Sequence, residues 1–104
     1  MANEQLSQKR PEIEALCRRF YVRRLRLFGS ALGSSWNAET SDFEFLVEYL
    51  PEVYRLGPLD RLVRLQVELE NLLGRSVDVV NVRTAKNLHF LERAERHAED
   101  IYAA

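Results

Sequence analysis

The sequence is poor in cysteine, glycine and proline and carries no excess of either charge. Cys17 is the single cysteine among 104 residues, which excludes an intramolecular disulfide and a zinc site built from several cysteines. Fifteen basic residues against sixteen acidic residues give a net charge of -1, which argues against a coat protein for DNA or RNA, because such proteins carry a basic excess.

Long apolar runs are also missing. No run approaches the ~20 residues that a membrane helix requires, and residues 1–10 are polar, without the apolar core of a signal peptide. We therefore expect a cytoplasmic protein with no membrane segment. The 46% hydrophobic and 30% charged residues are an ordinary globular balance, and the length predicts a single domain over residues 1–104 with its own core.

Apolar spacing predicts helices and strands along the chain. A helix with Pro11 in its first turn carries an apolar stripe at i, i+3, i+4 and i+7, formed by Ile13, Leu16, Cys17 and Phe20. Alternation predicts strands over residues 21–28, 43–49 and 76–82, with a loop rich in glycine and serine over residues 29–40. Between the second and third strands, a helix over residues 58–73 ends at Gly74.

The spacing of apolar residues also predicts which side of each of the last two helices faces the core. The apolar side of the helix over residues 58–73 is predicted to comprise Leu59, Leu62, Val63, Leu69, Leu72 and Leu73. A last helix is predicted after a cap at Thr84, with an inward face of Leu88, Leu91, Ala94, Ala98 and Ile101. The order is α-β-β-α-β-α, and the strand-helix-strand unit over residues 43–82 predicts a right-handed crossover. We expect an α/β (α+β) fold with a small mixed sheet flanked by helices.

Three acidic residues occupy positions that stability alone does not explain. Asp42 and Glu44 flank Phe43 and share a strand face, with Cα atoms about 6.6 Å apart at a rise of 3.3 Å per residue. Asp78 lies within a valine-rich strand, where aspartate is disfavoured. Converging carboxylates repel unless a cation compensates, and oxygen ligands suit Mg²⁺ or Mn²⁺. The alternative is structural: Asp42 ends a turn, Glu44 is solvated, and Asp78 bonds to a backbone or arginine partner.

Gly29 and Ser30 directly follow the first strand. Glycine lets the backbone turn and approach a ligand, and free amides together with the Ser30 hydroxyl would bind a phosphate. The segment lacks the lysine of a Walker motif and does not match a dinucleotide fingerprint.

In combination, these elements resemble the polymerase-β-like nucleotidyltransferase superfamily, and most closely its minimal nucleotidyltransferases. The resemblance covers residues 25–82 and rests on a strand, Gly29-Ser30, the pair Asp42-x-Glu44, a crossover helix and Asp78. It implies that Ser30 holds a nucleotide phosphate and that Asp42, Glu44 and Asp78 bind two Mg²⁺ ions. It further implies that AMP moves from ATP to a hydroxyl acceptor, with loss of pyrophosphate.

The resemblance also implies a partner. Minimal nucleotidyltransferases typically pair with a HEPN-domain protein, as the antitoxin that adenylylates the toxin on a tyrosine. A protein acceptor is favoured over a nucleic acid, because this short chain lacks the additional domains of relatives that act on tRNA or a template. A homo-oligomer is left open.

Two positions depart from the family pattern. The family has aspartate where this chain has Glu44, and ten residues where this chain has eleven between Ser30 and Asp42. An alternative function is therefore a catalytically degenerate antitoxin that binds its partner without turnover. Five arginines between residues 18 and 26 are predicted to form mostly a solvated face balanced by nearby acids.

Overall fold

The computed structural model describes residues 4–29 and 42–104. Its sheet has the strand order β3-β2-β1-β4. The strands are β1 (Val22–Phe28), β2 (Phe43–Tyr49), β3 (Val77–Asn81) and β4 (Glu99–Ala103), and the helices are α1 (Glu4–Arg19), α2 (Val53–Leu56), α3 (Pro58–Leu73) and α4 (Leu88–His97). β1 runs antiparallel to β2 and β4, whereas β2 and β3 are parallel.

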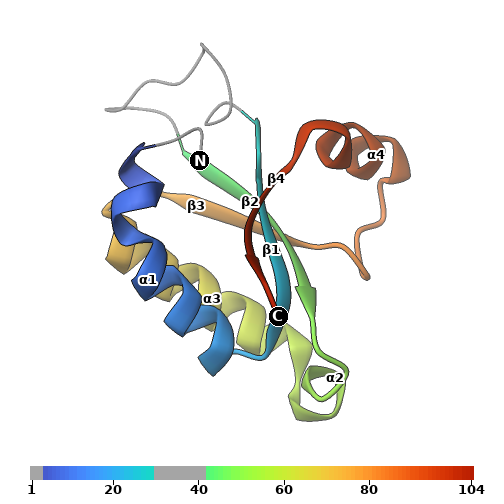
Figure 1. The fold of residues 1–104 in the computed structure, drawn as a ribbon. Coiled ribbons are helices and arrows are strands. Elements are labelled where there is room, and N and C mark those ends of the chain that lie inside the picture. The colour runs from blue at the N-terminus through green and yellow to red at the C-terminus, as the bar shows by residue number, and fades with distance from the viewer. Residues whose placement is uncertain (1–3, 30–41) are drawn as a thin grey trace.

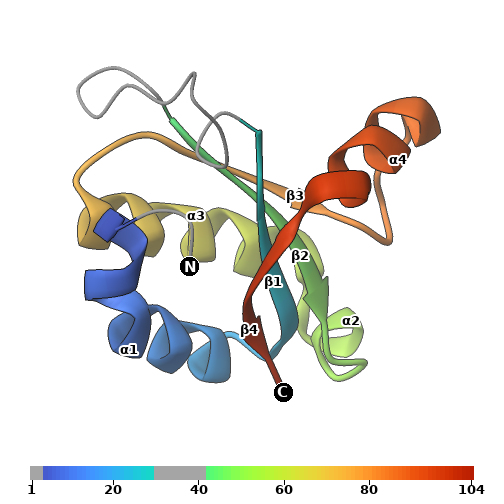
Figure 2. The same cartoon turned by 45° about the horizontal axis from the view of Figure 1, so that its top comes forward.

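The sheet separates two unequal layers. Helices α1 and α3 cover one face, and α4 lies on the other, as Figures 1 and 2 show. The core fills the space under α1 and α3, where Ile13, Leu65 and Leu69 meet Phe43 and Phe45 of β2. Side chains of a strand alternate between faces, so the even-numbered residues of β2 point towards the α4 side. We call this second side of the sheet the α4 face.

The central strand-helix-strand unit agrees with the prediction from sequence. The bounds of β2 and α3 are those expected, and β2 and β3 are parallel neighbours joined through α3, as the strand-helix-strand prediction requires. Gly74 ends α3 in the left-handed conformation with a φ of 68°, and its N–H donates to the carbonyl oxygen of Glu70 at 2.8 Å. The mixed α/β class is therefore confirmed.

The prediction for the first helix was wrong about its start. α1 begins at Glu4, so Pro11 lies inside the helix rather than in its first turn. Leu6 is fully buried and fixes the N-terminal half of α1 to the core. Because Leu6 is the single apolar anchor of that half, its apolar spacing is too sparse to reveal the helix.

The predicted last helix exists as α4, but the prediction was wrong about where it starts and ends. α4 begins after Asn87, whose side chain accepts a hydrogen bond from the Phe90 N–H at 3.0 Å, and not after Thr84. No residue of α4 is buried, and the chain continues as β4 along the edge of β1. Ile101 is fully buried as a strand residue. A β4 strand satisfies the edge of β1, which a helix would have left exposed.

The predicted inner face of α3 was wrong to include Leu59 and Val63, and it omitted Leu65. Leu65 and Leu69 are fully buried, while Leu59 and Val63 point outwards.

None of the described helices is long and apolar enough to cross a membrane.

Candidate functional site

Two of the three predicted acids lie on neighbouring strands of the α4 face. Glu44 of β2 and Asp78 of β3 are direct partners in the parallel register, and neighbouring strands lie about 4.8 Å apart. Asp42 immediately precedes β2 and is exposed, as is Asp78, whereas Glu44 is half-buried. We call these three residues the acid end of the α4 face.

Asp78 does not fit the structural alternative. Within the part of the chain that the structure describes, its side chain makes no hydrogen bond or ion pair. Aspartate is disfavoured in strands, and the side chain of Asp78 points to solvent while Val77 and Val79 beside it are buried. The carboxylate of Asp78 is thus exposed and available to a ligand.

The side chain of Glu44 occupies the space where a side chain at position 29 would lie. Gly29 directly follows β1, and Phe28 is the register partner of Glu44 in the antiparallel pair of β1 and β2. The φ of Gly29 is 82°, and a Cβ atom at this position would overlap the Oε2 atom of Glu44. The carboxylate of Glu44 therefore lies over the backbone of Gly29, and only glycine leaves it that space.

The acid end provides the oxygen donors that a divalent ion prefers. Carboxylates from two adjacent strands and from the residue before β2 are hard ligands of the type that Mg²⁺ and Mn²⁺ bind. Among the described residues, no three acidic, histidine or cysteine side chains are close enough to form a completed metal cluster. The donor chemistry of the three side chains fits a divalent ion.

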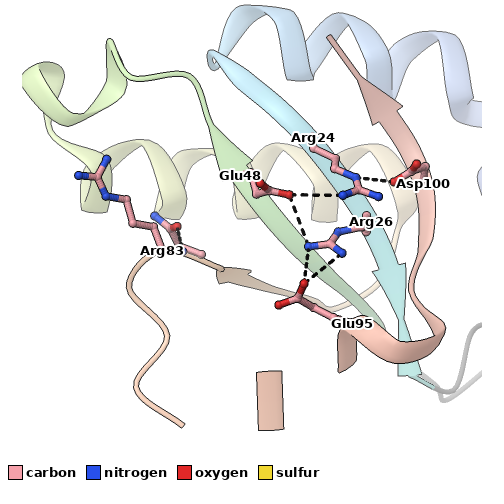
Figure 3. Close-up of polar contacts among 7 residues, drawn as sticks. Arg24, Arg26, Glu48, Arg83, Glu95 and Asp100 are labelled. Carbon is pink, nitrogen blue, oxygen red and sulfur yellow. Dashed lines mark hydrogen bonds and ion pairs between the residues drawn. The ribbon is translucent and has the colours of Figure 1, made fainter. Parts of the chain in front are cut away.

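The other end of the α4 face is rich in matched charges. Arg26 donates to Glu48 at 3.4 Å and to Glu95 of α4 at 3.5 Å, and its side chain is only 7% exposed. Arg24 donates to Asp100 of β4 at 2.7 Å. Figure 3 shows these five side chains converging from β1, β2, α4 and β4. We call them the arginine end.

The helix α4 connects the two ends. Its Phe90 ring meets Phe28 edge-on, with centroids 5.7 Å apart, and its Glu95 holds Arg26. Phe28 lies beside Glu44 in the sheet, so α4 forms one flank of the acid end. These contacts fix a helix that buries none of its own residues.

Sequence reasoning missed the burial of Arg26. It was predicted to belong to a solvated face, and the pairing with acids is confirmed, but the guanidinium is enclosed. The signal present in the sequence is that Arg26 lies between the apolar residues Leu25 and Leu27 of a strand. Interpreting it required the register of β1 on β2.

Other predicted residues have plain outcomes. Cys17 is buried, as expected, and burial raises the pKa of its thiol to about 12, with a smaller effect from Glu14. The thiol is therefore protonated and unreactive at neutral pH. Ser30, the predicted phosphate ligand, lies outside the described residues.

The family follows from comparison with known proteins. The model of the nucleotidyltransferase domain matches residues 12–101, which include Gly29 and all three acids. The chain belongs to the nucleotidyltransferase domain family. The comparison with curated proteins found no match.

Solved structures give the same fold. A protein assigned to the minimal nucleotidyltransferases is 33% identical, with a TM-score of 0.72 over 94% of both chains. A complex of the tri-AMPylated HEPN toxin of Shewanella oneidensis with MNT antitoxin aligns at 18% identity and a TM-score of 0.65, over 95% of this chain and 73% of that chain. A toxin-antitoxin structure with AMP-PNP aligns at 21% identity and a TM-score of 0.65, over 91% and 73%.

Proposed function

We propose that this nucleotidyltransferase moves AMP from ATP to a hydroxyl group of a HEPN partner protein, as the antitoxin of a toxin-antitoxin pair. The observation that carries the proposal is the pairing of Glu44 with Asp78, beside Gly29, at one end of a sheet face in a chain of this family. Neighbours in the fold comparison include an AMPylated HEPN toxin with MNT antitoxin and a complex holding an ATP analogue.

The proposed reaction assigns a role to each residue of the acid end. The acceptor oxygen forms a bond to the α-phosphorus of ATP, the bond from that phosphorus to pyrophosphate breaks, and the hydroxyl proton passes to Asp78. Asp42, Glu44 and Asp78 would hold divalent ions, which when bound offset the charge that develops on the phosphoryl oxygens. Ser30 and the backbone after Gly29 would bind a nucleotide phosphate.

One observation favours the second candidate, a partner-binding antitoxin without turnover. The carboxylate of Glu44 rests on Gly29, and the described acids do not form a completed cluster. Because Mg²⁺ tolerates little deviation from octahedral geometry, a ligand one methylene longer must be matched by the backbone. Under the first candidate function the Glu44 carboxylate binds the metal ion, and under the second it does not bind one well enough for turnover.

The deciding experiment incubates the chain with its HEPN partner, Mg²⁺ and ATP labelled at the α-phosphate, and then measures the mass of both proteins. We expect one or more adenylyl groups on the partner with the wild type, and none with Asp78→Asn or with chelator. If Glu44 is a working ligand, Glu44→Asp will be slower and Glu44→Gln nearly inactive. If the wild type is inactive and Glu44→Asp gains activity, the second candidate is correct. Equal transfer by all variants would show that position 44 does not bind the metal.

A further inference from the structure

A hollow lies at the opposite end of β2 from the acid end. Its volume is about 250 Å³, and β1, β2, α2 and the segment after β3 contribute to a lining that includes Arg23, Glu48, Tyr54 and Arg83. Glu48, on its border, is about 13 Å from Glu44 along β2, at a strand rise of ~3.3 Å per residue. A single phosphate or carboxylate group therefore cannot contact both places. We call this feature the Arg83 hollow.

The two arginines of the hollow have no acidic partner. Neither guanidinium group, that of Arg23 or that of Arg83, makes a hydrogen bond or an ion pair with any residue that the structure describes. Glu48 is the one carboxylate among the described lining residues, and its Oε2 atom instead faces Arg26 at 3.4 Å and Arg24 at 3.9 Å. In Figure 3 the guanidinium of Arg83 points away from Glu48. The hollow therefore presents cationic donors to whatever enters it.

Arg83 is oriented by its neighbours. Its guanidinium carbon lies 4.1 Å from the centroid of the Tyr54 ring, and its backbone N–H donates to the Oδ1 atom of the buried Asn81 at 3.0 Å. Stacking on a ring leaves the N–H groups at the edge of the guanidinium plane free to donate. Because the side chain is already oriented, it loses less conformational freedom when it binds a ligand. These contacts distinguish Arg83 from Arg93 of α4, which is exposed and makes no such contact with the described residues.

We propose that the Arg83 hollow binds an oxyanion, a phosphate or carboxylate group, with Arg83 and Arg23 as the hydrogen-bond donors. The planar guanidinium matches the spacing of two oxygen atoms in either group. The hollow has several times the ~30 Å³ that one water molecule occupies in the liquid, so it admits the group together with atoms that carry it. The group belongs either to a small phosphorylated molecule or to an acidic side chain of a partner protein. The proposal is independent of nucleotidyl transfer at the acid end.

The test is a titration of the isotope-labelled full chain, followed by NMR in the presence of chelator. Inorganic phosphate is added in one series and a polyglutamate peptide in the other. Without a cation, the carboxylates of the acid end repel both probes. We expect saturable shifts of the side-chain N–H signals of Arg23 and Arg83 with both probes, and the probe that binds more tightly identifies the source of the group. No saturable shift at these arginines with either probe would overturn the proposal.

Single substitutions separate the hollow from the overall charge of the chain. Arg83→Gln should weaken binding of the tighter probe about tenfold, because a hydrogen bond to a charged group is lost, and Arg23→Gln should also weaken it. Arg93→Gln removes the same charge outside the hollow and should leave the affinity unchanged. If Arg93→Gln weakens binding as much as Arg83→Gln does, or if Arg83→Gln has no effect, the probes respond to overall charge and the hollow is not a binding site.

A pair of substitutions at Tyr54 tests the orientation of Arg83. Tyr54→Phe keeps the ring beneath the guanidinium and should bind the probe as the wild type does. Tyr54→Leu removes the ring and should bind it about two- to fivefold more weakly, which is the range expected from losing an exposed cation–π contact. The NMR spectrum itself shows whether each variant is folded. Equal affinity of the two variants would show that Tyr54 does not orient Arg83 for binding.

Discussion

The two ends of the α4 face share strand β2 and differ in how their carboxylates are paired. At the arginine end, Glu48, Glu95 and Asp100 are each within 3.5 Å of an arginine nitrogen. At the acid end, Glu44 and Asp78 are register partners, and Asp78 has no protein partner among the described residues. The arginine end is therefore held together by ion pairs, whereas Asp78 at the acid end is exposed to solvent, which is where we propose that a cationic ligand binds.

Among the changes considered, Arg26→Ala should cause the largest loss in the free energy of unfolding. Arg26→Ala leaves Glu48 and Glu95 close together without their shared cation. We expect a loss of about 2–3 kcal/mol, below the 3–5 kcal/mol of a fully buried pair because both carboxylates are about a third exposed. Urea unfolding measures this loss.

Arg24→Ala is the matched control on the same strand. Arg24 is 42% exposed, and surface pairs of this kind contribute no more than about 1 kcal/mol. Equal losses for the two arginines would mean that burial does not distinguish them, and the arginine end would lose its assigned role in fixing α4.

Gly29 and Glu44 should be energetically coupled. Gly29→Ala costs about 1–2 kcal/mol from its left-handed backbone alone, and the new Cβ atom also displaces the carboxylate of Glu44. In a Glu44→Asp background, the shorter side chain leaves room for the Cβ atom, so the cost of displacing the carboxylate should disappear. We expect a coupling energy of about 1 kcal/mol, measured by a double-mutant cycle of unfolding free energies.

Gly74 provides the control for this cycle. It also has a positive φ, but a Cβ atom there meets nothing within 4 Å. Gly74→Ala combined with Glu44→Asp should therefore be additive. A coupling of the same size at Gly74, or none at Gly29, would show that the overlap of Glu44 with position 29 has no energetic consequence.

Neutralising one carboxylate at each end should give small effects of opposite sign. Asp78→Asn removes repulsion from Glu44 and should raise the stability of the metal-free protein by up to about 1 kcal/mol, because like charges that face each other across a strand pair are destabilising. Asp100→Asn removes an attraction to Arg24 and should lower stability by less than about 1 kcal/mol. Thermal melting at low salt, with chelator present, measures both. If both variants are stabilised or both are destabilised, the carboxylates of the two ends do not differ in their electrostatic environment as described here.

The sequence was informative where local pattern and tertiary structure agree. Alternation in β2, a proline start and a glycine end for α3, and the valines of β3 together predicted the parallel unit that makes Glu44 and Asp78 neighbours. The acids themselves were identifiable because aspartate within an apolar strand contradicts the propensity of its surroundings.

The remaining features depend on pairing that no local pattern encodes. Ile101 fits a helical stripe as well as a strand, and the uncovered edge of β1 decides in favour of β4. The burial of Arg26 requires Glu95 to reach it from a helix 69 residues away in sequence. Val63 fits a core position by spacing alone, and its exposure is visible only once α3 has been placed on the sheet.

The central claim is that the acid end, and not the arginine end, takes up a divalent ion with a nucleotide. Titration calorimetry of the full chain with Mn²⁺-ATP tests it most directly, using wild type, Asp78→Asn and Asp100→Asn. We predict similar affinity for wild type and Asp100→Asn, and affinity at least tenfold weaker, about 1.4 kcal/mol, for Asp78→Asn and for ATP with chelator. Equal affinity in all four titrations, or a loss confined to Asp100→Asn, would contradict the assignment of the site.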